Sequence, residues 1–217
     1  SLGVTPDKAF AVLQASFAGL EVVSITDLEN PSKVDNLLTD DGNKISVDKL
    51  GTGSLYYRNI VNGNVNGMIG VIGMENSVWL RSTGENLQLV ASYRNSLYRE
   101  EGGTASMTDG TVVTIANNGY RVYDPIADMN SDLSNLNVNK VSDVFISGKA
   151  TVSDGMLVVC NAYKGEIWVI NIANPESPVL VSNFEISGNP DLCLVTENYI
   201  LIPVKHSGLM KITRSAK

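Results

Sequence analysis

The sequence predicts an all-β fold built from repeated four-stranded units, and two observations carry this prediction. Apolar runs of about four to seven residues alternate with turn pairs such as Asp-Gly, Asn-Gly and Asn-Pro, and no long amphipathic helix pattern is present. In addition, residues 20–34 overlay residues 167–181 without a gap, at an offset of 147. Self-similarity at a fixed spacing is typical of a repeat protein.

The clearest repeated element is a hairpin at residues 166–181. Residues 167–172 are β-branched and aromatic, residues 174–178 form a turn cluster with two prolines, and a second apolar run starts at Val179. This order predicts strand, tight turn, strand. Because residues 20–34 have the same order, we expect the same hairpin near the start of the chain.

A second repeated element precedes the hairpin. Residues 106–113, 151–158 and 194–201, and more loosely 3–10, each consist of a short apolar run, a polar turn and another apolar run. Asp-Gly, found twice in this element, is a favoured two-residue hairpin turn because glycine adopts positive φ at little cost.

Joined together, the two elements form a unit of four strands, here called a, b, c and d. Strand c can be followed through Leu20, Val78, Tyr120, Ile167 and Leu209, with spacings of 58, 42, 47 and 42. The repeats cover approximately residues 1–44, 45–95, 104–146, 149–187 and 190–217. Strand d of the first repeat is predicted at residues 33–38, and the fifth repeat has no predicted strand d.

Four-stranded repeats of about 40–50 residues are typical of β-propeller blades. One such unit cannot bury both of its faces, whereas stacked units bury a continuous core. We therefore expect residues 1–217 to form a single propeller domain of about five blades, the last one incomplete. A closed five-bladed ring and a segment of a larger propeller both fit this pattern.

The motifs GLEVVSI at residues 19–25 and EIWVINI at residues 166–172, each followed by a proline-containing turn, resemble the LVIVD-repeat family. GYRVYDP at residues 119–125 and GLMKI at residues 208–212 are weaker copies, and the second repeat departs from the motif. The family's aspartate after strand c is present only as Asp124, with Ser24 and Asn171 elsewhere. The resemblance implies a propeller located outside the cell, in the periplasm or at the cell surface, and supplies no catalytic residues.

Composition excludes several classes of protein. Of the 217 residues, 43% are hydrophobic and 18% are charged, which indicates a folded chain, and the net charge is −7. We therefore expect no generic attraction to nucleic acid. No apolar run approaches the ~18 residues of a membrane span. The first residues lack a signal-peptide pattern, which is compatible with the mature form of a secreted protein.

Two cysteines, Cys160 and Cys193, each lie in an apolar run. Buried free thiols are the simplest interpretation, since free cysteine packs as a small hydrophobic residue. A disulfide requires Cα atoms within about 7 Å of each other.

In a propeller, the b–c loops and the d–a connections share one face. Because binding residues concentrate on loops held by a rigid scaffold, we predict a ligand site on this face. The candidate residues are Phe17, Glu75, Arg99, Glu100, Tyr163, Lys164, Lys205 and His206. The opposite face carries mainly Asp, Asn, Pro and Gly turns, and we expect no site there.

Neither catalysis nor metal binding has a convincing signature. His206 is the only histidine, and no Gly-x-Ser-x-Gly motif provides a nucleophile for it. Residues 128–139 begin like a calcium loop but have Leu133 and Asn139 where glycine and glutamate are required. One histidine and two separated cysteines are too few for a zinc site. We expect no catalytic residue, no metal and no cofactor.

The sequence therefore predicts a non-enzymatic propeller that binds a protein or carbohydrate ligand through its b–c loop face. A carbohydrate-active hydrolase or lyase is one alternative, since glycoside chemistry needs two carboxylates about 5–10 Å apart. Glu75, Glu100 and Glu101 are the candidates for that role. A propeller that binds a small ligand or a metal is the other alternative.

Overall fold

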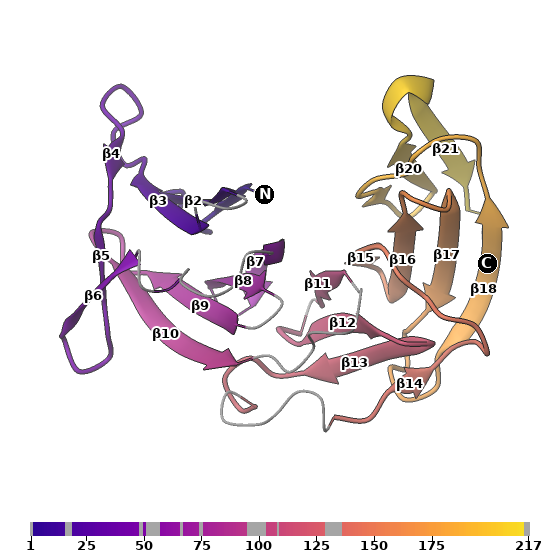
Figure 1. Cartoon of the computed structure of the whole chain (residues 1–217), viewed down its shortest axis with the longest axis horizontal. Coiled ribbons are helices and arrows are strands. Elements are labelled where there is room, and N and C mark those ends of the chain that lie inside the picture. The colour runs from indigo at the N-terminus through magenta and orange to yellow at the C-terminus, as the bar shows by residue number, and fades with distance from the viewer. Residues whose placement is uncertain are drawn as a thin grey trace. The chain divides into compact units, whose positions relative to one another are not determined.

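The computed structural model describes residues 2–15, 19–47, 50, 57–65, 67–73, 76–94, 103–107, 109–128 and 136–214. The chain divides into two compact units. The first comprises residues 1–99, 108–111 and 123–135, and the second comprises residues 100–107, 112–122 and 136–217. Strands dominate both units, and no described helix is long and apolar enough to cross a membrane (Figure 1).

The first unit contains two sheets. Sheet 1 is four-stranded and antiparallel, in the order β1 (Leu2–Val4), β2 (Phe10–Ala15), β3 (Gly19–Ser24) and β4 (Ser32–Lys33). Sheet 2 has six strands in the order β6 (Lys44–Ser46), β5 (Asn36–Leu38), β10 (Leu87–Arg94), β9 (Asn76–Ser82), β8 (Met68–Gly73) and β7 (Tyr57–Val65). Buried side chains from both sheets, including Val12, Val22, Val71 and Leu80, form one core cluster.

The prediction of a single strand d at residues 33–38 of the first repeat is wrong. Only Ser32–Lys33 pairs with β3, and the chain then moves to sheet 2, where β5 pairs in parallel with β10. The turn after β5 returns the chain as β6, so sheet 2 has six strands where four were expected. The division follows from the sequence, because Asp35 and Asn36 separate Val34 from the apolar pair Leu37–Leu38.

The second unit contains three consecutive sheets. Sheet 3 runs β11 (Thr104–Ser106), β12 (Val112–Ala116), β13 (Gly119–Tyr123) and β14 (Asn139–Lys140), with only Tyr123 assigned to the first unit. Sheet 4 runs β15 (Lys149–Ser153), β16 (Met156–Asn161), β17 (Glu166–Asn171) and β18 (Val179–Glu185). Sheet 5 runs β19 (Leu194–Val195), β20 (Tyr199–Pro203) and β21 (Leu209–Thr213). These strands follow the order a-b-c-d expected from the repeats.

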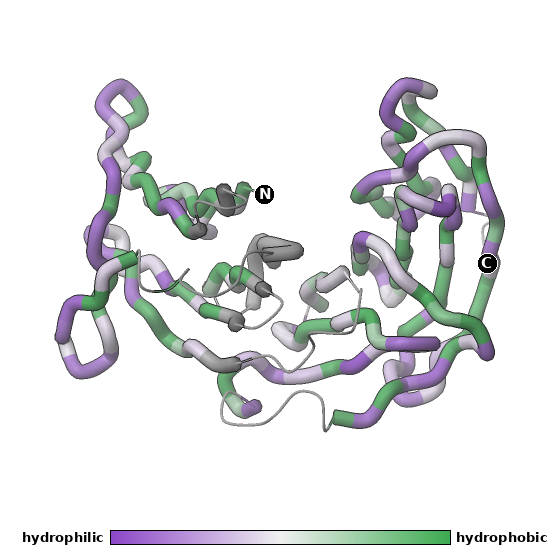
Figure 2. Tube along the Cα trace, in the orientation of Figure 1, coloured by the Kyte–Doolittle hydropathy of each residue, from purple (hydrophilic) through white to green (hydrophobic). Residues whose placement is uncertain are grey.

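The two central strands of sheet 4, β16 and β17, are buried on both faces, which explains why they are almost continuously hydrophobic (Figure 2). Successive side chains of a strand point to opposite faces. Leu157 and Val159 of β16 therefore pack with sheet 3, in a cluster that also holds Tyr120 and Trp168. Val158 and Cys160, the alternate residues, pack with sheet 5. Trp168 is therefore buried between sheet 3 and sheet 4.

The first strands of the three sheets also lie next to each other. β11 contacts β15, and β15 contacts β19. Face-to-face sheets with adjacent first strands are the arrangement of successive propeller blades. The structure confirms the all-β prediction and the stacking of repeated sheets within each unit.

Candidate functional site

Half of the predicted binding residues cannot be placed. Phe17, Glu75, Arg99 and Glu100 lie outside the described residues. Glu101, considered for glycoside chemistry, lies outside them as well. The other four belong to two loops of the second unit: Tyr163 and Lys164 lie between β16 and β17, and Lys205 and His206 lie in a short 3-10 segment, Lys205–Ser207, between β20 and β21.

The loop after β16 is closed by Asn161. Its Oδ1 accepts hydrogen bonds from the backbone N–H groups of Tyr163 (3.0 Å) and Lys164 (3.1 Å), and its Nδ2 donates to Ser147 Oγ (2.8 Å). Tyr163 is fully exposed, and Lys164 Nζ lies 3.8 Å from Glu166 Oε1. The loop therefore presents a free aromatic ring on an ordered backbone.

The d–a connection between β18 and β19 lies beside both loops. Ile186 N donates to Gly165 O (2.9 Å), and Asp191 N donates to Pro203 O (3.0 Å). Asp191 is ion-paired with Lys149. Although burial opposes the shift, hydrogen bonds from Lys149 and the Leu192 N–H, and the charges of Lys149 and Lys205, lower the pKa of Asp191. The b–c loops and the d–a connection thus share one side of sheets 4 and 5, as the topology predicted.

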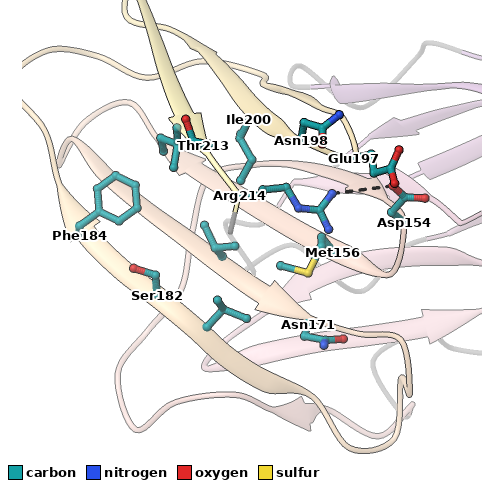
Figure 3. A pocket seen from close by; sticks show the side chains of 13 residues that line it. Asp154, Met156, Asn171, Ser182, Phe184, Glu197, Asn198, Ile200, Thr213 and Arg214 are labelled. Carbon is teal, nitrogen blue, oxygen red and sulfur yellow. Dashed lines mark ion pairs between the residues drawn. The ribbon is translucent and has the colours of Figure 1, made fainter. Parts of the chain in front are cut away.

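A groove opens on the other side of these two sheets, where the a–b turns lie (Figure 3). Its cavity volume is about 1060 Å³. One wall is formed by Met156, Val169, Asn171, Val181, Ser182 and Phe184 of sheet 4. The other wall is formed by Ile200, Ile212 and Thr213 of sheet 5, and Asp154, Glu197, Asn198 and Arg214 form the rim.

The floor of the groove continues the apolar core between the two sheets. Met156, Val169 and Ile200 belong to the buried cluster, and Phe184 and Ile212 pack against it. The outer wall is different, since Val181 on β18 is 57% exposed. An occupant of the groove would therefore contact a packed apolar floor and an exposed apolar side chain on the outer wall.

Arg214 fixes the polar end of the groove. It follows β21 directly, and its backbone N–H donates to Asn198 O (2.9 Å). Its Nη1 donates to Thr196 O (2.6 Å) and lies 3.8 Å from Asp154 Oδ2, the ion pair drawn in Figure 3. Asp154 and Glu197 are exposed, whereas the Arg214 side chain is only 23% exposed. The rim therefore carries two carboxylates and one cation. That cation, the guanidinium of Arg214, is already hydrogen-bonded to Thr196 O and paired with Asp154.

The groove combines an apolar floor with carboxylates at its rim. The groove holds no histidine and no cysteine, and among the described residues no group of His, Cys, Asp and Glu is suited to a metal ion. An apolar floor beside two carboxylates favours a ligand with apolar groups next to a cation or a hydrogen-bond donor.

The groove lies on the a–b turn face, where we expected no site, and none of the predicted binding residues lines it. Its residues come from five strands, two turns and the position directly after β21, and only the packing of sheet 4 on sheet 5 brings them together. One signal was present in the sequence: the a–b turns Asp154-Gly155 and Glu197-Asn198 occupy equivalent positions in adjacent repeats. Equivalent turns of stacked repeats lie on one side of the stack.

No known protein-family profile matches the chain, and no curated protein sequence matches it. Solved structures do resemble it. U3-55K aligns over 98% of this chain and 60% of its own, with a TM-score of 0.63 and 12% identity. The WD40 repeats of RRP9 align over 100% of this chain and 60% of their own, with a TM-score of 0.62 and 14% identity.

PorZ, a bacterial surface component of the type-IX secretion system of Porphyromonas gingivalis, aligns over 99% of this chain and 27% of its own. Its TM-score is 0.60 at 10% identity. NirN, a dihydro-heme d1 dehydrogenase, has a TM-score of 0.57 at 14% identity, with 45% of its chain covered. The chain thus spans less than two thirds of each of these proteins. At such low identities the similarity shows the fold alone, which is that of a β-propeller.

Proposed function

We propose that this protein is a non-enzymatic propeller scaffold that binds a partner protein through an extended segment seated in the groove between sheets 4 and 5. The observation that carries the proposal is the groove itself, a cavity of about 1060 Å³ with an apolar floor and a net acidic rim. The propeller fold, which WD40 proteins share, is compatible with this role.

The chemistry of the groove defines the partner segment. Val181, Phe184 and Ile212 offer contacts for one or two apolar side chains, and Glu197 and Asp154 attract a basic residue beside them. The net charge of −7 also favours a basic or neutral partner. We therefore expect an extended peptide in which Lys or Arg lies next to a large apolar residue.

Location and family membership complete the proposal. The LVIVD-like motifs around residues 19–25 and 166–172 support membership of that family, and the family supports a secreted, periplasmic or cell-surface location. We also propose that the five described sheets are blades of one propeller domain, either a five-bladed ring or part of a larger propeller.

The test is a selection of linear peptides displayed on phage against the full chain, followed by affinity measurements with the enriched peptides. Selected sequences should combine a basic residue with a large apolar one. Val181→Asn should weaken their binding roughly tenfold, about 1.4 kcal/mol, because a polar amide replaces an apolar contact. Glu197→Gln should weaken it further and reduce its dependence on salt.

Val179→Asn is the matched control for this experiment. Val179 lies on the same strand and is 59% exposed, close to the 57% of Val181, but it does not line the groove. Binding to the Val179→Asn variant should stay within about twofold of the original, far less than the tenfold loss expected at Val181. Equal losses in the two variants would contradict the proposed site.

The b–c loop side remains a second candidate surface because Tyr163 is fully exposed on an ordered loop. Tyr163→Ala, together with Lys164→Ala, Lys205→Ala and His206→Ala, tests it with the same peptides. If these variants abolish binding while Val181→Asn does not, the partner binds on the loop side and the groove is not the site.

A further inference from the structure

We propose that Cys160 and Cys193 form a disulfide site that joins sheet 4 covalently to sheet 5. The two residues come from different repeats, Cys160 from β16 and Cys193 from the position immediately before β19. They lie in one buried cluster and are 1% and 8% exposed. Both thiols are free and buried in this structure, and each shifts the pKa of the other.

The backbone around both cysteines is held by β15. Cys160 pairs with Lys149 of β15 in the antiparallel ladder. Thr151, two residues further along β15, donates a hydrogen bond from its Oγ1 to Cys193 O (3.2 Å). One strand therefore positions both cysteines, and the two side chains belong to the same buried cluster.

The environment separates the roles of the two thiols. The neighbouring Cys193 thiol and burial both raise the pKa of Cys160. The neighbouring Cys160 thiol lowers the pKa of Cys193, although burial opposes that shift. Cys193 is also the more exposed of the two. Because it is the more accessible thiol, Cys193 is the one that a disulfide oxidant reaches first.

The reaction requires an oxidant, and a small disulfide such as oxidised glutathione supplies it. The Cys193 thiolate attacks one sulfur of that disulfide, breaks its S–S bond and releases one glutathione thiolate. Cys160 then loses its proton and attacks the Cys193 sulfur, which expels the second glutathione. Two protein thiols lose two protons and two electrons, and the oxidant becomes two thiols.

This inference does not depend on the proposed peptide groove. It does agree with the proposed location, because disulfides persist in secreted and periplasmic proteins and are rare in the cytosol. The bond would cross-link the same two sheets that form the walls of the groove.

The experiment is to refold the reduced, full chain in a mixture of oxidised and reduced glutathione, trap free thiols with iodoacetamide and measure the intact mass. Because the chain contains only two cysteines, an internal disulfide can join only this pair. We expect a monomer about 2 Da lighter than the reduced chain with no trapped thiol. Its melting temperature should exceed that of the reduced form by roughly 5–10 °C.

Refolding makes the result independent of access to the buried thiols in the folded chain. Cys193→Ser is the control, since its single thiol should be trapped or carry one glutathione and should never give the lighter mass. The proposal is overturned if the refolded chain retains two alkylated thiols, carries glutathione on both cysteines, or forms only disulfide-linked dimers. It is also overturned if the internally bonded monomer melts at the same or a lower temperature than the reduced form.

Discussion

Short polar side chains close the turns of this protein, and their hydrogen bonds repeat from sheet to sheet. Asp27 Oδ1 accepts the backbone N–H of Glu29 (3.0 Å), and Asn174 Oδ1 accepts that of Glu176 (3.2 Å). Asp27 and Asn174 are separated by the same offset of 147 residues that relates the two hairpins. Such bonds fix a turn locally, so these turns could be predicted from sequence.

Threonine closes the a–b turn in the same way in the first and the fifth sheet. Thr5 Oγ1 accepts the N–H of Phe10 (3.0 Å), and Thr196 Oγ1 accepts the N–H of Tyr199 (3.1 Å). The turn after Thr5 is two residues longer than the turn after Thr196, which explains why residues 3–10 match the repeated element only loosely. In sheet 4 the same turn is Asp154-Gly155, with φ values of 51° and 64°. Positive φ at both central residues is typical of a type I′ hairpin.

Glycine at position 119 is required for a different reason, which can be tested directly. A Cβ atom on Gly119 would lie 2.0 Å from the carbonyl oxygen of Asn139, on the paired strand β14. Gly119→Ala should therefore displace β14 and lower the free energy of unfolding by ~2 kcal/mol or more, measured by urea denaturation.

Gly42→Ala is the control, because it measures the cost of backbone strain without a steric clash. Gly42 has a φ of 78°, but a Cβ atom there would have no neighbour within 4 Å. Strain alone should cost about 1 kcal/mol. If Gly119→Ala proves no more destabilising than Gly42→Ala, the close approach of β14 to β13 is wrong.

At the scale of elements, the strands of sheet 4 could be predicted because their hydrophobic runs reflect burial on both faces. In β17, Ile167 and Val169 pack toward sheet 5. The alternate residues, Trp168 and Ile170, pack toward sheet 3. β5 could not be assigned to its sheet in this way. It has three residues, and its parallel pairing with β10 joins Leu38 to Gln88, a contact that no local pattern specifies.

Tyr120 connects two sheets and makes stability sensitive to high pH. Its hydroxyl, on β13, donates to Pro175 O in the loop between β17 and β18 (2.7 Å). Burial raises the pKa of Tyr120 to about 12 from an ordinary value of 10.0. The folded chain therefore holds this proton more tightly than the unfolded chain. The resulting stability is complete below pH 10 and is lost as the pH rises from 10 toward 12.

Tyr120→Phe keeps the ring and removes the hydroxyl. The variant should lose about 1 kcal/mol of stability at pH 7, the contribution of one hydrogen bond. It should also lose less stability than the original protein as the pH rises from 10 toward 12. Urea denaturation at each pH measures both effects, and parallel pH profiles for the two proteins would show that Tyr120 is not the responsible group.

At the scale of the whole molecule, the period of the repeat and the stacking of sheets within each unit could be predicted, but the candidate groove could not. The period can be measured from the spacing of equivalent strand c positions, from Leu20 to Leu209. The groove depends on how far sheet 5 covers sheet 4, which leaves Val181 and Phe184 accessible beside Arg214. Neither the sequence of sheet 4 nor that of sheet 5 specifies that relation by itself.

The central claim, a peptide-binding groove between sheets 4 and 5, is tested most directly by amide hydrogen exchange of the full chain with and without a selected peptide. We predict slower exchange in residues 179–185, 196–201 and 209–214, which border the groove. The loops at residues 162–165 and 205–207 should exchange at unchanged rates. Protection confined to those loops, with none at β18, would contradict the claim.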